Sequence, residues 1–92
     1  MTRVQWTTNA ATDLARIVEH IRKDNPTAAQ RVARTIYSAI AGLQQFPQSG
    51  RIGLAESTRE LVFPPWPYIV VYEIVGEQVH VLRIRHASQD WP

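Results

Sequence analysis

The sequence predicts an α+β fold in which a helical hairpin packs on one face of an antiparallel sheet, with the element order β-αα-βββ. Two observations predict this fold. Apolar residues recur at helical spacing through most of the first half, and the last third alternates β-branched and aromatic runs with Pro and Gly. Helices grouped before strands are typical of α+β domains. Residues 1–92 are expected to form a single domain.

The first half of the chain predicts a short strand followed by two helices. The alternating stretch Arg3–Trp6 is a candidate edge strand. Thr8 or its neighbours can cap a helix over residues 9–24, and Asn25 can cap a second helix over residues 26–46. Because almost nothing joins the two helices, they are expected to form an antiparallel hairpin. The residues expected to be buried between the second helix and the sheet are Val32, Ile36, Ile40, Leu43 and Val70.

The last third predicts three strands, after a loop over residues 48–57. The strands correspond to the apolar runs 61–63, 68–74 and 79–84, which are separated by Pro-rich and Gly-containing turns. The short link at Gly76 predicts that the last two strands form a hairpin. The middle strand is apolar on both faces, so it should be central and covered on both sides. The helical hairpin supplies one cover, and a partner is expected to supply the other.

Alternation of side chains gives the last predicted strand two faces. The side chains expected on one face are His80, Leu82, Ile84 and His86, and those expected on the other are Val79, Val81, Arg83 and Arg85.

The composition argues against several classes of function. Without cysteine, the chain cannot form disulfides, thiolate nucleophiles or cysteine-ligated zinc, and no carboxylates stand at ligand spacing, so no metal or cofactor is expected. The chain has neither a membrane-length apolar run nor a signal-peptide pattern, so a cytoplasmic protein is expected. The net charge is +2, with the positive excess in the helical half. That distribution argues against an electropositive RNA-binding cleft on the sheet.

A polar cluster follows the last predicted strand and contains the candidate site residues. His86 beside arginines could act as a general acid or base, or could be a partly exposed polar side chain. Arg59, Arg83 and Arg85 could clamp a phosphate or an acidic partner, or could form ordinary ion pairs.

Two tryptophans are candidate interface anchors. Trp66 in the Pro-rich turn and Trp91, which follows Asp90, could each fill the core or bind a partner. Trp91 is expected to fold back onto the sheet.

Taken together, these stretches resemble the RelE/ParE superfamily of toxins from bacterial type II toxin–antitoxin modules. The resemblance covers nearly the whole chain. The stretches that match best are Arg59-Glu60-Leu61, Tyr68-Ile69-Val70-Val71-Tyr72, and Arg83-Ile84-Arg85-His86 with Asp90-Trp91 behind them.

The resemblance implies one of two activities. RelE-like toxins are ribosome-dependent endoribonucleases that cut mRNA, whereas ParE-like toxins poison DNA gyrase without a recognised catalytic site. The resemblance also implies a role in plasmid stabilisation and growth inhibition. The implied partner is a cognate antitoxin whose disordered tail folds on the toxin and forms a hetero-oligomer with it.

Three departures from the nuclease pattern favour the ParE-like alternative. Ile69 stands where RelE-like nucleases have a phosphate-stabilising arginine, Glu60 and Val62 lie in the region where some members have lysines, and Ala87 replaces a tyrosine. If the chain is a nuclease, the expected catalytic residues are Arg59, Arg83, Arg85 and His86. The residues expected to bind a target or partner are Trp66, Arg85, His86, Asp90 and Trp91.

Overall fold

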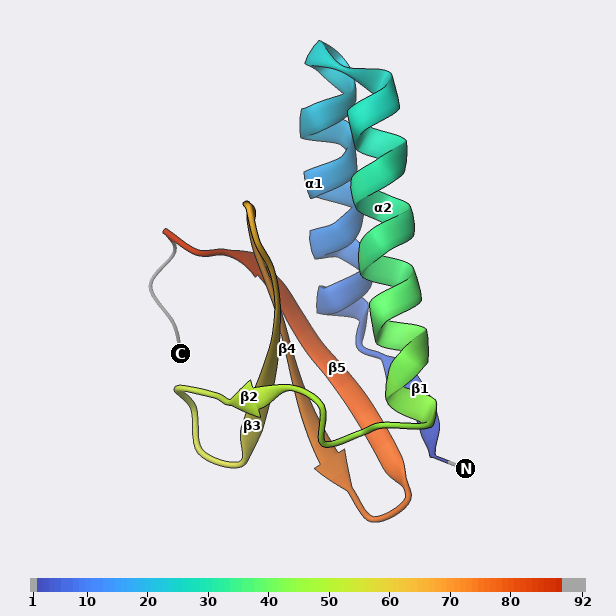
Figure 1. The fold of residues 1–92 in the computed structure, drawn as a ribbon, viewed down its shortest axis with the longest axis vertical. Helices are drawn as coiled ribbons and strands as arrows, with labels where there is room; N and C mark the ends of the chain where they lie inside the picture. Colours follow the sequence, from blue (N-terminus) through green and yellow to red (C-terminus); the bar gives the residue numbers. More distant parts are fainter. Residues whose placement is uncertain (1, 89–92) are drawn as a thin grey trace.

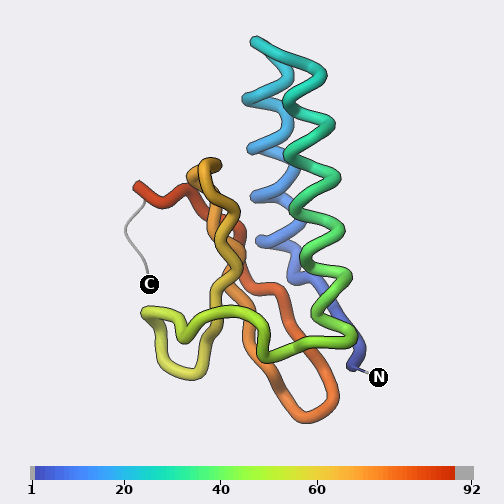
Figure 2. The backbone as a smooth tube through the Cα atoms, viewed as in Figure 1, coloured from blue at the N-terminus to red at the C-terminus, as the bar shows by residue number. Residues whose placement is uncertain are grey.

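The computed structural model describes residues 2–88, in which a helical hairpin lies along one face of a five-stranded sheet (Figure 1). This arrangement confirms the predicted α+β class. The far ends of both helices extend beyond the sheet, as the backbone trace also shows (Figure 2). The elements are β1 (Arg3–Trp6), α1 (Thr8–Asp24), α2 (Pro26–Ala41), a 3₁₀ turn (Gly42–Gln44), β2 (Arg51–Ile52), β3 (Thr58–Phe63), β4 (Trp66–Val75) and β5 (Gln78–His86).

The sheet is mixed, so the prediction of a wholly antiparallel sheet is wrong. Its strand order is β1-β5-β4-β3-β2, and β1 pairs with β5 in parallel while the other neighbours are antiparallel. The direction of β1 follows from its connection, because β1 continues directly into α1 and α1 packs along β5. The fifth strand, β2, lies inside the predicted loop 48–57. Its two residues are too few to give a periodic signal.

Both helices begin at side-chain caps. The Thr7 hydroxyl accepts a hydrogen bond from the Ala10 amide, so α1 begins one residue before the predicted start. The Asn25 side chain caps α2 in the same way, as expected. The prediction that this helix reaches Phe46 is wrong, because the chain tightens into the 3₁₀ turn after Ala41. This tightening keeps Leu43 fully buried and leaves Phe46 67% exposed on the way to β2.

The core lies between α2 and the sheet, as the helical spacing predicts. Val32, Ile36 and Ile40 pack with Val70 in one buried cluster, and Leu43 packs in a second cluster. Each fully buried aliphatic side chain of this kind contributes about 1.5–3 kcal/mol to the free energy of folding.

A β-bulge in β5 overturns the predicted alternation of that strand. Val71 pairs with Arg83 while Tyr72 pairs with Val81, so Leu82 is an additional residue in β5. The bulge reverses the side-chain phase, and Ile84 therefore joins Val81 in the core beneath the helices. The prediction of which β5 side chains share a face is therefore wrong for the residues after Val81. An apolar residue at the bulge does not interrupt the hydrophobic pattern, so the sequence gives no signal for it.

The segment that leads from the hairpin to β2 is fixed by a buried tyrosine. The Tyr72 hydroxyl donates a hydrogen bond to the Pro47 carbonyl (2.7 Å) and accepts one from the Gly50 amide (2.9 Å). A Cβ atom at Gly50 would lie 2.6 Å from the Tyr72 hydroxyl oxygen. Glycine is therefore required at this position by close packing.

Within residues 2–88, neither α1 nor α2 combines the length and apolar character that crossing a membrane requires.

Candidate functional site

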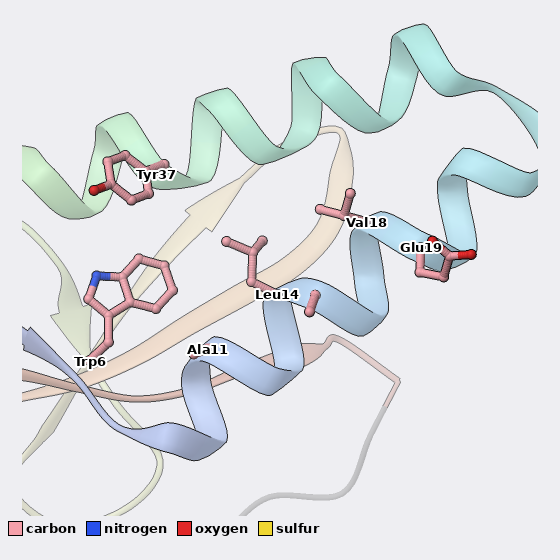
Figure 3. A pocket seen from close by; sticks show the side chains of 7 residues that line it. Trp6, Ala11, Leu14, Val18, Glu19 and Tyr37 are labelled. Atoms are coloured by element: carbon pink, nitrogen blue, oxygen red, sulfur yellow. The ribbon is translucent and has the colours of Figure 1, made fainter.

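An open apolar groove of about 610 Å³ lies between α1 and α2 (Figure 3). Trp6 and Tyr37 stand side by side at one end of it, and Glu19 lies at the other end. The two rings stack, with centroids 6.0 Å apart and planes inclined by 27°. The residues that line this apolar groove are Trp6, Ala11, Leu14, Ala15, Val18, Glu19 and Tyr37.

The apolar groove exists because α1 has more apolar surface than α2 covers. Ala11, Leu14, Ala15 and Val18 are spaced as i, i+3, i+4 and i+7, which places them on one helix face. The small alanine side chains leave the space that the rings border. Tyr37 from α2 is 63% exposed. An exposed apolar surface bordered by aromatic rings is typical of a protein-binding site.

Arg59 forms structural hydrogen bonds with the main chain. Its Nη1 atom donates hydrogen bonds to the carbonyl oxygens of Gly50 (2.8 Å) and Gln48 (3.3 Å). The guanidinium therefore holds the segment that approaches β2, and it lies on β3, two strands away from β5.

Arg83 forms a bidentate ion pair with Asp13 of α1. Its Nε and Nη2 atoms donate to the two carboxylate oxygens at 2.8 and 3.1 Å, and the Ile84 amide donates to the same carboxylate at 2.9 Å. The hydrogen bond to Asp13 raises the pKa of Arg83, so its guanidinium stays charged. Asp13 is only 8% exposed. The positive charge of Arg83 is therefore compensated within the protein.

Arg85 is buried, on the sheet face opposite the helices. It is 6% exposed, and its Nη2 atom lies 3.7 Å from a Glu60 carboxylate oxygen. Glu60 is itself buried and also pairs with Arg51 of β2 at 2.9 Å. The bulge at Leu82 causes this placement, because it turns Arg85 away from the helices. Burial argues against the predicted contact of Arg85 with a partner.

His86 is exposed at the end of β5. Its Nδ1 atom accepts a hydrogen bond from the Ser88 amide at 3.1 Å. The ring meets Tyr68 edge-on, with centroids 5.9 Å apart.

The structure brings together two of the four predicted catalytic residues. Arg83 and His86 both line a pocket of about 240 Å³ between α1 and the ends of β4 and β5, which we call the basic pocket. Arg59 and Arg85 do not line it. The polar residues that line the basic pocket are Asp13, Arg16, His20, Tyr68, Arg83 and His86.

Of the two tryptophans predicted to anchor a partner, Trp66 lies within the described residues and Trp91 does not. Trp66 is the first residue of β4, where it is partly exposed and packs against the core. Asp90 and Trp91 lie outside the described residues, so their predicted roles remain predictions. Across residues 2–88, no cluster of three His, Asp or Glu side chains is placed to hold a metal ion.

The sequence analysis missed the apolar groove. The spacing of Ala11, Ala15 and Val18 was a usable signal, because it gives α1 a second apolar stripe beside Leu14. Trp6 and Tyr37 are 31 residues apart along the chain, and only the packing of β1 beside the helices brings them together.

The similarity to known proteins extends over nearly the whole chain. A family model described as the ParE toxin of the type II toxin-antitoxin system parDE matches residues 4–91. The Sinorhizobium fredii protein Y4kP, whose name gives it the provisional role of a toxin, is 44% identical over 90 residues, 98% of this chain and 93% of that protein. Toxin RelE2 of Caulobacter vibrioides is 40% identical over 89 residues, 97% and 99% of the two chains.

Two solved structures share the fold. A chain of the chromosomal ParDE TA system from P. aeruginosa matches with a TM-score of 0.85 and 27% identity, covering 96% of this chain and 98% of that one. A chain of the intact E. coli RelBE toxin-antitoxin complex matches with a TM-score of 0.63 and 13% identity, covering 97% and 100%. At that identity the second match shows the fold alone. On the family match, this chain belongs to the ParE toxin family of type II toxin–antitoxin systems.

Proposed function

We propose that this ParE-family toxin arrests bacterial growth by poisoning DNA gyrase, and that a cognate antitoxin neutralises it by binding the apolar groove. In this proposal the toxin acts through protein contacts and has no catalytic site of its own. A module of this kind would stabilise the plasmid or chromosomal segment that encodes it.

The observation that supports a protein target is that the three arginines predicted to bind a phosphate are engaged in contacts within the fold. Phosphoryl transfer needs preorganised cations directed at the developing charge, and one missing donor costs about two to three orders of magnitude in rate. Here Arg59 binds main-chain carbonyls, Arg83 pairs with Asp13, and Arg85 is buried beside Glu60. Ile69, at the position where the resemblance places a phosphate-binding arginine, is an apolar residue only 7% exposed.

The apolar groove supports an antitoxin partner. Apolar side chains, two stacked rings and a volume of about 610 Å³ suit the apolar face of an amphipathic segment. The similar chain of the P. aeruginosa ParDE TA system, 27% identical to this one, agrees with a partner of this kind.

A second candidate function is ribosome-dependent cleavage of mRNA. Two Caulobacter vibrioides relatives, 40% and 30% identical, have the name RelE. Arg83 and His86 also line one pocket, where His86 could act as a general acid or base.

Replacing His86 separates the two candidates. The His86→Ala toxin is expected to keep most of the growth arrest of the wild type, because a protein-binding toxin needs no proton transfer at this position. A nuclease that uses His86 would lose about two to four orders of magnitude in rate. The measurement is growth after induction without antitoxin, with mRNA ends mapped in parallel.

His80→Ala is the matched control, because His80 is also on β5 and lies outside the basic pocket. Strong mRNA cleavage that disappears in His86→Ala and persists in His80→Ala would favour the nuclease instead.

A further inference from the structure

The basic pocket lies on the opposite flank of α1 from the apolar groove. Arg16 and His20 of α1 form one wall, and Tyr68 of β4 and His86 of β5 form the other. Arg16 and His20 are four residues apart, so they lie one above the other on the same helix face. Both side chains are exposed, and this wall is accessible to a ligand.

The charge of this pocket is positive once its internal ion pair is counted. Among the described residues that line it, Asp13 alone has a carboxylate. That carboxylate already accepts three hydrogen bonds, two from Arg83 and one from the Ile84 amide. The pair is neutral as a whole and presents no unsatisfied anion. Arg16 supplies a permanent positive charge, and His20 and His86 supply imidazole groups. A small anion fits this combination of groups.

The basic pocket and the apolar groove are continuous across α1. A shallow hollow on the outer surface of α1 is lined by Ala15 and Glu19, which also line the groove, and by Arg16 and His20, which also line the pocket. Ala15 has only a methyl group, so a chain can cross the helix close to its axis. Glu19 forms an ion pair with Arg22 at 2.8 Å, which compensates its charge at the crossing.

We propose that the basic pocket binds a carboxylate side chain of the antitoxin, on a segment that crosses α1 from the apolar groove. This inference rests on the proposed binding of the antitoxin in the groove and adds a second, polar anchor to it. A helix with its side chains is about 10–12 Å wide, so an extended segment needs about three to four residues to cross it. The antitoxin segment should therefore have apolar residues and an Asp or Glu separated by about that number.

The first test measures the affinity of the purified toxin for its full-length cognate antitoxin by calorimetry. Arg16→Gln is expected to weaken binding about tenfold, the range for one charged contact. Arg34→Gln, an exposed arginine of α2 that does not line the pocket, is the matched control and should change affinity less than about twofold. Melting curves of the free variants establish that each one is folded.

The second test is a charge exchange. Arg16→Glu should weaken binding further. An antitoxin in which one acidic residue is changed to Lys should recover much of the lost affinity for the Arg16→Glu toxin, and it should show no such gain with the wild-type toxin. Equal weakening by Arg16→Gln and Arg34→Gln would overturn the inference, because it would show a long-range effect of net charge. Unchanged antitoxin affinity in Arg16→Gln, with lost binding to an RNA or DNA oligonucleotide, would also overturn it.

The two proposals can fail separately. If Tyr37→Asp weakens antitoxin binding and Arg16→Gln does not, the apolar groove is the antitoxin site and the carboxylate inference is wrong. If neither variant weakens binding, the antitoxin binds elsewhere and both proposals are wrong.

Discussion

A Tyr37→Asp toxin is expected to bind its antitoxin at least about 100-fold more weakly than the wild type, which corresponds to about 2.7 kcal/mol. The antitoxin would desolvate the new carboxylate in an apolar groove whose lining, within residues 2–88, includes no Lys or Arg. The substitution also removes the ring that stacks on Trp6. Tyr and Trp are enriched among the interface residues whose truncation costs about 2 kcal/mol or more of binding free energy. Calorimetric titration with the antitoxin gives the affinity.

Phe46→Asp is the matched control for this substitution. Phe46 is 67% exposed and Tyr37 is 63% exposed, and both are aromatic, but Phe46 lies outside the apolar groove. Its replacement should leave antitoxin affinity within about twofold of the wild type, because a new charge on a free surface stays hydrated. Equal affinities for the two variants would show that the groove is not where the antitoxin binds.

The second large effect is expected on stability, from Asp13→Asn. The carboxylate accepts hydrogen bonds from Arg83 and from the Ile84 amide and is nearly buried. Hydrogen bonds to a charged group contribute about 1.5–3 kcal/mol to stability. Removing the charge leaves Arg83 without its counter-ion and weakens the polar link between α1 and β5 beside the bulge. A loss of about 2–3 kcal/mol lowers the melting temperature of a domain of this size by about 10–20 °C.

Asp24→Asn tests whether this effect is specific. Asp24 is the exposed last residue of the same helix, and its neutralisation should shift the melting temperature by less than about 2 °C. Thermal unfolding followed by circular dichroism compares the two variants. If Asp13→Asn melted within the same margin, the ion pair with Arg83 would have no role in joining the hairpin to the sheet.

The parts of the fold that depend on local patterns were predictable. The stripe on α2 and the caps at the helix starts follow from spacing and residue type, because helix formation depends on nearby residues. The 3₁₀ ending of α2, the two-residue strand β2 and the bulge at Leu82 depend on how distant segments meet. None of these three features changes the local hydrophobic pattern, and the sequence analysis therefore missed them.

The candidate site was less predictable, because its chemistry depends on partners far away in the chain. Arg83 and Asp13 are separated by 70 positions, and their pairing decides that the charge of Arg83 is compensated within the protein. The phase reversal at the bulge decides that Arg85 is buried beside Glu60 whereas His86 is exposed. From residue types alone, the sequence predicts that these side chains form one polar cluster. The sequence already shows that position 69 has an isoleucine and not an arginine. The burial of Ile69 in the structure agrees with the interpretation that this position does not bind a phosphate.

The most direct test of the proposed function is the effect of the purified toxin on purified DNA gyrase. With supercoiled plasmid and ATP, gyrase in the presence of the toxin is expected to accumulate cleaved, linear DNA, and prior addition of the antitoxin should prevent this. Tyr37→Asp toxin should escape that protection, because it no longer binds the antitoxin tightly. Unaltered gyrase activity at micromolar toxin, together with cutting of mRNA on isolated ribosomes, would contradict a gyrase-directed toxin.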